Sequence, residues 1–347
     1  MAACGAMNLR ELSLELGLSQ TTVSRALNGF PEVSEETRAR VKAAADLHGY
    51  RPSAAARRLA TGQSGTLGLV FPAERNMLSD LLFTEFLSGC VEKAGERGYD
   101  VTLAMARGGL SEEAVYRRAV RSARVDAMIL SSPLVRDTRL DLLNGLHLPF
   151  IVHGRTDARG PYAHLDIDNE GAFRAATKLL TDLGHRRIAL LNGETRYTFA
   201  SDRERGYRTA LSAAGVALDD ELVCADPMGE LSGWRQAQRL LARTPRPTAF
   251  VCSTITQAAG VARACRSAGL KIGQDVSLIA HDDRLHEFGA ETFDPPLTAT
   301  QSSIGDAGRR IVELCINMLQ APQAPVPAEV WPVNLVVRGS TGPAPTP

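Results

Sequence analysis

A group of polar side chains recurs at helical spacing near the N-terminus. Gln20, Thr21, Ser24 and Arg25 fall at positions i, i+1, i+4 and i+5, so they share one face of a helix predicted over residues 20–27. Amide and guanidinium groups pair with adenine and guanine edges in the major groove of DNA. The small polar residues of this segment that are suited to phosphate contacts are Thr22, Ser24 and Asn28. The pattern therefore indicates a helix able to read DNA.

Three short helices would position these side chains. A leucine-faced helix over residues 8–16 stops at Gly17, and Ser19 and Ser34 are good N-caps for the second and third helices. Two helices joined by a tight glycine-containing turn, with a third behind them, predict a helix-turn-helix domain. The alternative is a generic three-helix bundle with a solvated polar face. Charge does not decide between them, because residues 1–63 hold eight Lys or Arg and six Asp or Glu.

A short arginine-containing segment follows. Residues 53–60 favour a helix but are shorter than the roughly 12–15 residues that an isolated helix needs in water. They contain Arg57 and a single large apolar residue, Leu59, and lead into a linker at residues 61–65. The segment predicts either a partly helical linker or an element that becomes ordered on DNA, with Leu59 as an apolar wedge in the minor groove.

Length and composition indicate an ordinary globular protein of two or three domains. The chain has 347 residues, of which 44% are hydrophobic and 22% charged, and 39 basic residues balance 39 acidic ones. This balance excludes a histone-like protein and an acidic disordered one. No apolar run approaches the roughly 20 residues of a membrane span, and residues 1–10 do not resemble a secretory signal. Six scattered cysteines without a C-x-x-C pair favour a reducing, cytoplasmic location.

From Thr66 onward, short apolar segments alternate with helix-like ones. The predicted strands cover residues 66–71, 101–106, 127–130, 150–153, 187–191, 249–252 and 276–280. Strands that alternate with helices of this length predict parallel α/β sheets. About 280 residues are too many for one small sheet, so two α/β lobes are expected.

Several motifs resemble the lactose-repressor (LacI/GalR) family of bacterial transcription regulators. The run LRELSLELGLSQTTVSRALNG at residues 9–29 is followed by VSEETR at 33–38, GYRP at 49–52 and ARRL at 56–59. Later motifs are DIDNEG at 166–171, LGHRRIA at 183–189, RERGY at 203–207 and DVSLIAHDD at 275–283. Within the family, the segments around His153, Cys252 and His281 are most similar to regulators of α-glucoside utilisation.

The resemblance implies an α/β fold with three parts. A helix-turn-helix headpiece occupies residues 7–50, a hinge helix and linker 51–64, and a two-lobed ligand-binding and dimerisation domain 65–340. This core is shaped like a periplasmic sugar-binding protein. Lobe 1 would comprise about 65–162 and 296–322, and lobe 2 about 163–295 and 323–340, with crossovers near Ala163, Pro295 and residues 321–327. The Pro-rich tail from Gly339 predicts disorder.

The resemblance also implies roles for individual residues. Gln20, Thr21 and Arg25 would read the major groove, and Leu59 would be the wedge at the centre of the operator. Arg203 matches the family arginine that holds a ligand hydroxyl or carboxylate, and Asp282 matches an aspartate that faces the cleft; both are expected to end strands. The full predicted ligand set is Ser131, His153, Arg155, Arg203, Ser253 and Asp282.

The chain departs from the family pattern at two places in the core. Ser253 and Thr254 stand where Asn-Asp is usual, and Gly154 stands where an acidic residue is common. The expected function is a repressor of carbohydrate-uptake or catabolism genes that acts as a homodimer on a palindromic operator. A mono- or disaccharide in the cleft would control it, without a cofactor.

Three other interpretations remain open at this point. A transport sugar-binding protein is disfavoured by residues 8–59 and by the absence of a visible signal sequence. An α/β enzyme is disfavoured because no phosphate-binding loop or nucleophile motif is present. The histidines and aspartates at 281–286 resemble a metal cluster only loosely, and such clusters are more often ordinary polar surface.

Overall fold

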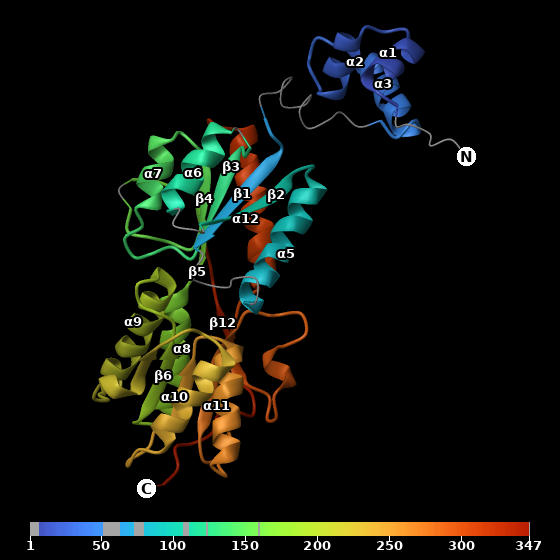
Figure 1. The fold of residues 1–347 in the computed structure, drawn as a ribbon. Coiled ribbons are helices and arrows are strands. Elements are labelled where there is room, and N and C mark those ends of the chain that lie inside the picture. Colours follow the sequence, from blue (N-terminus) through green and yellow to red (C-terminus); the bar gives the residue numbers. More distant parts are fainter. Residues whose placement is uncertain are drawn as a thin grey trace.

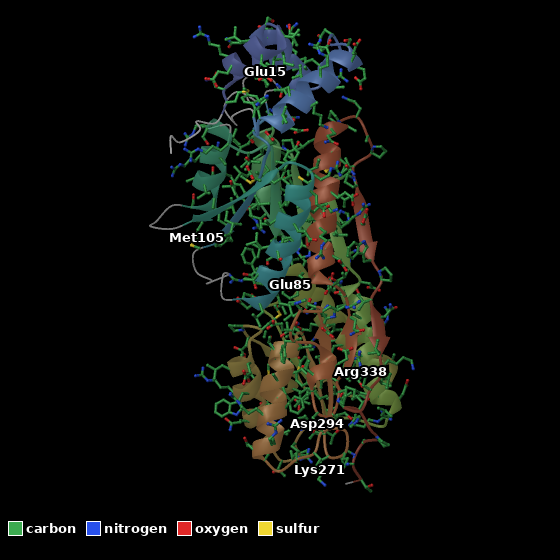
Figure 2. The ribbon with its side chains drawn as sticks, turned by 90° about the vertical axis from the view of Figure 1, so that its right-hand side faces the viewer. Glu15, Glu85, Met105, Lys271, Asp294 and Arg338 are labelled. Atoms are coloured by element: carbon green, nitrogen blue, oxygen red, sulfur yellow. The ribbon has the colours of Figure 1, made fainter. Side chains whose placement is uncertain are left out.

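The protein is described by a computed structural model that covers residues 7–50, 63–72, 80–106, 111–122, 124–158 and 160–346. The predicted DNA contacts Arg57 and Leu59 lie outside these residues. Figures 1 and 2 show two α/β lobes stacked along the long axis of the molecule, with Glu85 near their junction and Asp294 and Lys271 towards the far end of the second lobe. Within the described residues, none of the helices is both long enough and apolar enough to cross a lipid bilayer.

The headpiece consists of α1 (Leu9–Leu16), α2 (Gln20–Leu27) and α3 (Glu35–Leu47). The predicted caps are confirmed: Ser19 accepts a hydrogen bond from the amide of Thr22, and Ser34 accepts one from Thr37. Gly17 adopts the left-handed conformation, with φ 66°, that ends α1. The small core buried between the helices consists of Leu12, Val23, Ala26, Val33, Val41 and Ala45. These contacts place the polar face of α2 on the outside.

The first lobe is built on six parallel strands in the order β11-β5-β4-β3-β1-β2. The strands are β1 (Thr66–Pro72), β2 (Asp100–Ala106), β3 (Ala127–Ser131), β4 (Phe150–His153), β5 (His164–Ile167) and β11 (Ala328–Trp331). One face is covered by α5 (Leu81–Glu96) and α12 (Ile304–Gln320), the other by α6 (Glu112–Arg121) and α7 (Arg139–Gly145) (Figure 1). Gly89 allows α5 and α12 to approach closely, because a Cβ there would lie 2.1 Å from the carbonyl oxygen of Gly305.

The second lobe repeats this architecture in the order β12-β10-β9-β8-β6-β7. Its strands are β6 (Ile188–Asn192), β7 (Val223–Ala225), β8 (Ala249–Cys252), β9 (Ser277–Asp282), β10 (Thr298–Gln301) and β12 (Asn334–Val336), of which only β12 runs antiparallel to its neighbour. One face is covered by α8 (Asn169–Asp182) and α9 (Thr198–Ala213), the other by α10 (Glu230–Leu241) and α11 (Ile255–Ser267). The predicted parallel α/β lobes are confirmed.

The predicted crossovers between the lobes are wrong. Residues after Ala163 form β5 and residues after Pro327 form β11, and these two strands pair with each other at the edge of the first sheet. After Pro295 the chain forms β10 in the second sheet before it enters α12. The three crossings therefore lie between β5 and α8, between β10 and α12, and between β11 and β12. Pro295 and Pro327 therefore lie shortly before β10 and β11, and neither marks the passage between lobes.

The C-terminal segment is ordered, contrary to the prediction of disorder from its composition. Ser340 is fully buried; its hydroxyl donates to the carbonyl of Leu278 at 2.6 Å and accepts from the amide of Thr298 at 2.8 Å. The amide of Ala344 donates to the carbonyl of Leu183 at 2.8 Å. Residues 339–346 thus run across the second lobe and satisfy backbone groups there, which a Pro-rich segment can do without forming a helix or strand.

Candidate functional site

The outer face of α2 presents the side chains expected to read bases. Gln20, Thr21 and Arg25 are exposed, whereas Val23 and Ala26 on the opposite face are buried. The exposed residues and Ser24 line a shallow hollow on the headpiece. Arg25 makes no ion pair with any residue that the structure describes. Its guanidinium is therefore available for a bidentate contact with a base edge.

Two further predicted DNA contacts already have partners within α2. The hydroxyl of Thr22 lies 2.8 Å from the hydroxyl of Ser19, the capping residue. The side-chain amide of Asn28 donates to the carbonyl of Ser24 at 2.8 Å. Both groups retain acceptor or donor capacity, so phosphate contacts by these residues stay a prediction.

A cavity lies between the lobes at the carboxyl ends of their strands, where ligands bind in open α/β sheets. Three of the six predicted ligand residues line it: Ser131 ends β3, His153 ends β4, and Arg203 comes from α9. Its other lining residues are Asp80, Leu82, Phe83, Phe86, Ser132, Pro133, Gly154, Asp166, Ile167, Asn169, Phe199, Met228, Thr254, Asp283, Ser302, Ser303, Ile304 and Ala307. The cavity therefore combines aromatic walls with a few polar groups, as small-molecule sites do.

Arg203 is a buried cation that makes no ion pair with any residue in the described part of the chain. Its Nε donates to Oδ1 of Asn169 at 2.8 Å and its Nη1 to the carbonyl of Ser253 at 2.7 Å. The guanidinium carbon lies 5.0 Å from the ring centre of Phe173 and 5.2 Å from that of Phe199. Burial lowers the pKa of Arg203 to about 10, so the group remains charged at neutral pH. Among the described residues nothing accepts from Nη2, so its two N–H groups and the second N–H of Nη1 are left for a ligand.

The position of Arg203 corrects one expectation. The residue was expected to end a strand, but it lies within the first two turns of α9. The helix delivers the guanidinium to the cavity because Asn169, at the start of α8, accepts from it and fixes its plane.

Asp283, and not Asp282, lines the cavity. Both oxygens of Asp282 are occupied within its own lobe: Oδ1 accepts from the amide of Arg284 at 2.8 Å, and Oδ2 accepts from the amide of Ala290 and the side chain of Gln301, each at 3.1 Å. In Asp283, Oδ1 lies 3.5 Å from Nε2 of His281, and Oδ2 is buried without a hydrogen-bond partner in the described residues. An orphaned buried carboxylate oxygen indicates a missing donor, which a ligand hydroxyl can supply.

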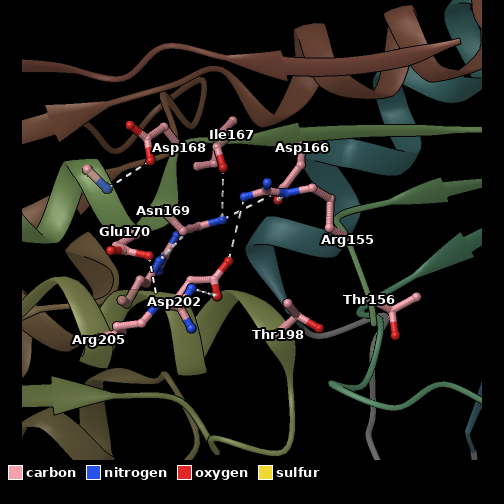
Figure 3. Close-up of polar contacts among 12 residues, drawn as sticks. Arg155, Thr156, Asp166, Ile167, Asp168, Asn169, Glu170, Thr198, Asp202 and Arg205 are labelled. Carbon is pink, nitrogen blue, oxygen red and sulfur yellow. Dashed lines mark hydrogen bonds and ion pairs between the residues drawn. The ribbon is translucent and has the colours of Figure 1, made fainter. Parts of the chain in front are cut away.

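Arg155 and Ser253 do not line the cavity. Arg155 connects the lobes instead: its Nε lies 2.7 Å from Oδ2 of Asp166 in the first lobe, and its Nη2 lies 3.7 Å from Oδ2 of Asp202 in the second (Figure 3). Ser253 donates from its hydroxyl to Oδ1 of Asn192 at 2.7 Å, and the next residue, Thr254, reaches the cavity.

His153 forms part of the aromatic wall. Its ring stacks on Phe86 with centres 4.4 Å apart and planes 9° from parallel. Burial lowers the pKa of His153 to about 4, although Asp283 partly opposes the shift, so the ring is neutral at pH 7. The next residue, Gly154, has a φ of 108°, and a Cβ there would lie 2.7 Å from Cγ of Pro133. Any residue with a side chain would therefore be strained at this position, and glycine fits it.

Two backbone segments, one from each lobe, are joined by hydrogen bonds beside the cavity. The amide of Val135 donates to the carbonyl of Arg196, and the amide of Thr198 donates to the carbonyl of Pro133, both at 3.0 Å. We call residues 133–135 and 196–198 the interlobe clasp. The hydroxyl of Thr156 donates to the carbonyl of Leu134 at 2.7 Å and holds the first segment in place.

Sequence reasoning missed several residues of the cavity. Asp166 and Asn169 lie in the DIDNEG motif that carried the resemblance, so the motif was the signal that pointed to them. Asp283 follows the residue that was chosen. Phe86 and Phe199 gave no signal, because an aromatic residue on a helix is usually part of the core.

Comparison with known proteins gives matches over nearly the whole chain. Residues 8–53 match the family described as bacterial regulatory proteins, lacI family, and residues 177–341 match the periplasmic binding protein-like domain. The chain is 47% identical over 341 residues to the HTH-type transcriptional regulator AglR of Rhizobium meliloti (strain 1021), which covers 98% of this chain and 95% of AglR.

Solved structures agree with these matches. A complex of the transcriptional regulator CelR with cellobiose is similar with a TM-score of 0.70 and 28% identity, over 96% of this chain and 99% of CelR. The lac repressor dimer bound to operator and the anti-inducer ONPF is similar with a TM-score of 0.78 and 26% identity, over 97% of this chain and 99% of the repressor.

Proposed function

This chain belongs to the lacI family of bacterial regulatory proteins, and we propose that it represses carbohydrate-uptake or catabolism genes under the control of a sugar in the interlobe cavity. The observation that carries the proposal is that one chain joins an exposed base-reading face on α2 to a two-lobed core whose cavity holds an unpaired cation and an orphaned carboxylate. A DNA-binding face does not need a ligand cavity, and a ligand cavity does not need a DNA-binding face. A DNA-binding protein that responds to a ligand uses both.

On the DNA side, Gln20, Thr21 and Arg25 contact base edges, and Thr22, Ser24 and Asn28 contact phosphates. Arg57 and Leu59 complete the proposed contacts through the hinge. The protein acts as a homodimer on a palindromic operator, since two-fold symmetry of the protein is mirrored in the site. The similar lac repressor structure is a dimer bound to operator, which supports this arrangement.

On the effector side, the ligand is a mono- or disaccharide. Ser131, His153 and Arg203 remain in the proposed site, and Asn169, Thr254 and Asp283 join them. The similar CelR structure contains cellobiose, which supports a carbohydrate. The other three predicted residues support the site without lining it. Asp282 holds the loop that follows β9, and Ser253 bonds to Asn192 beside Thr254. Arg155 connects the two lobes through Asp202.

Two other functions are less well supported. A transport sugar-binding protein would need the cavity but has no use for the α2 face. An enzyme would need a set of catalytic side chains around its substrate. The chain is instead similar to a transcriptional regulator, AglR. We therefore propose a non-enzymatic protein that works in the cytoplasm, where operator DNA is accessible.

Selection of DNA from a random pool by the full-length protein, followed by binding titrations near 150 mM salt, tests the proposal. We expect an enriched palindrome that binds at least about 10³-fold more tightly than a scrambled sequence. Arg25→Ala should weaken binding to the palindrome by ~1–3 kcal/mol if Arg25 makes a bidentate base contact. A pool without an enriched palindrome would contradict the proposal, and parent-like affinity of the variant would contradict the role of Arg25.

A further inference from the structure

The charges around the interlobe cavity are unevenly balanced. Its charged lining residues within the described chain are Asp80, Asp166, Asp283 and Arg203. Arg155 offsets Asp166 through their contact at 2.7 Å. The remaining two carboxylates exceed the single guanidinium, and the neutral ring of His153 adds no charge. We propose that this cavity takes an uncharged sugar and rejects the phosphorylated or carboxylated form of the same sugar, an inference that rests on the proposed function.

Asp283 gives the strongest reason. Its buried Oδ2 lacks a donor in the described residues, so it stabilises a ligand group that carries a proton, such as a hydroxyl. A phosphate carries a charge of about −1.5 to −2 at pH 7 and mainly accepts hydrogen bonds. A phosphate or carboxylate next to Asp283 would leave the orphaned oxygen unpaired and add like-charge repulsion inside a partly desolvated site.

Arg203 compensates for this repulsion only in part. Anions prefer two parallel N–H groups of a guanidinium, in a fork. Here the single N–H of Nε is engaged by Asn169 at 2.8 Å, so the edge that Nε shares with Nη2 cannot form a fork, and one of the two N–H groups of Nη1 is engaged by Ser253 at 2.7 Å. The N–H groups left on Nη1 and Nη2 suit hydroxyl and ring oxygens, each of which accepts one or two single hydrogen bonds.

The walls of the cavity suit an uncharged ring as well. Phe83, Phe86 and Phe199 line it, and His153 stacks on Phe86 at 4.4 Å. The carbon-bound hydrogens of a sugar ring pack against such apolar surfaces, whereas an ionic group placed there would lose hydration without a partner. Charge and shape therefore favour the same class of effector.

Calorimetric titration of the full-length protein tests the inference with matched pairs. The neutral probes are glucose, galactose and trehalose; the charged probes are glucose 6-phosphate and glucuronate, galactose 6-phosphate, and trehalose 6-phosphate, respectively. We expect the best neutral sugar to bind at least 100-fold more tightly than its charged form. A charged form that binds as tightly as its neutral parent would overturn this inference and leave the proposed regulator intact. If no sugar binds while the palindrome still does, both the carbohydrate assignment and this inference are wrong.

Asp283→Asn tests whether Asp283 causes the selectivity. The variant removes the charge and keeps the size, so the ratio of charged-form Kd to neutral-form Kd should fall at least tenfold. Asp141→Asn, at an exposed position in α7, removes the same charge far from the cavity lining and should leave the ratio unchanged. An unchanged ratio in Asp283→Asn would overturn the role of Asp283. If that variant does not fold, the titrations of the parent protein still decide the inference.

Discussion

Asp282 and Asp283 are adjacent in the chain, yet the fold gives their carboxylates opposite surroundings. Asp282 is the last residue of β9, and side chains alternate in direction along a strand. Its carboxylate turns into the loop that follows and accepts from Arg284, Ala290 and Gln301. Asp283 turns towards the cavity and keeps an oxygen free. The first carboxylate therefore holds the loop, and the second is placed to hold a ligand.

Asp282→Asn should mainly affect stability. The substitution replaces one carboxylate oxygen by an NH₂ group, which cannot accept the hydrogen bonds that Asp282 receives. We therefore expect the free energy of unfolding to fall by ~1–3 kcal/mol. The effector Kd should change less than about threefold, since the side chain does not line the cavity. Urea denaturation and sugar titration measure the two quantities. If the variant is as stable as the parent but no longer binds sugar, Asp282 contacts the sugar and this interpretation is wrong.

His153 gives a pH dependence whose sign follows from its environment. Burial lowers its pKa to about 4 in the folded state, against about 6.5 in the unfolded chain, so the unfolded state takes up the proton first as the pH falls. Stability that is present above about pH 6.5 is therefore lost as the pH drops towards about 4. Between pH 7 and pH 5 the parent should lose ~1–2 kcal/mol more than His153→Phe, which keeps the stacking on Phe86. Parallel stability curves for the two proteins would contradict this explanation.

The candidate site could be predicted only in part at this scale. Ser131 and His153 end strands, and Arg203 lies in a recognisable motif, so sequence alone pointed to three residues that line the cavity. The choice between Asp282 and Asp283 depends on where β9 ends, and the predicted strand over residues 276–280 ended two residues before β9 does. Phe86 depends on a helix that packs across the sheet, and this was not visible from the sequence.

At the scale of elements, local chemistry specifies helix ends better than sheet edges. The caps Ser19 and Ser34 and the terminator Gly17 were predicted because each acts on residues within one turn. The crossovers were misplaced because pairing between β5 and β11 joins segments more than 150 residues apart, such as Leu165 and Glu329. No short-range pattern records such a pairing.

The interlobe clasp is an element whose contribution can be isolated. Thr198 is the first residue of α9, where the amide has no partner within the helix and proline is favoured. Tyr197 before it has φ −85° and ψ 136°, a conformation compatible with a following proline. Thr198→Pro should therefore preserve α9 and remove the hydrogen bond to Pro133. We expect the effector Kd to rise about three- to tenfold, since one hydrogen bond contributes ~0.5–1.5 kcal/mol.

Thr198→Val is the matched control for the clasp. It removes the hydroxyl, which lies 3.4 Å from the carbonyl of Pro133, but keeps the amide. Its effector Kd should stay near that of the parent, and the free energy of unfolding of both variants should stay within about 1.5 kcal/mol of the parent's. Equal effector affinities for Thr198→Pro and the parent would show that the clasp does not contribute to the ligand-bound arrangement of the lobes.

At the scale of the whole molecule, the cavity and the base-reading face belong to different domains. An effector changes DNA affinity only through its different affinities for two arrangements of the protein. The chain passes between the lobes three times. The lobes are also joined by the hydrogen bonds of the interlobe clasp and by the contact of Arg155 with Asp202. Lobe movement at these points is the route by which sugar binding would reach the hinge and headpiece.

Arg203→Ala should separate the two functions of the chain. Arg203 lies in α9, contacts no residue of the headpiece, and donates within the core to Asn169 and Ser253. Its loss removes the buried charged donor of the cavity, so we expect sugar affinity to fall at least 100-fold, while operator affinity without sugar stays within about threefold of the parent. If the sugar is an inducer, the variant represses constitutively; if it is a corepressor, the variant does not repress.

Calorimetry measures the sugar affinity of the Arg203→Ala variant, and operator titrations with and without sugar measure its operator affinity in each state. Parent-like sugar affinity would mean that the pocket is misplaced. An altered operator affinity without sugar would mean that Arg203 also sets the resting arrangement of the lobes.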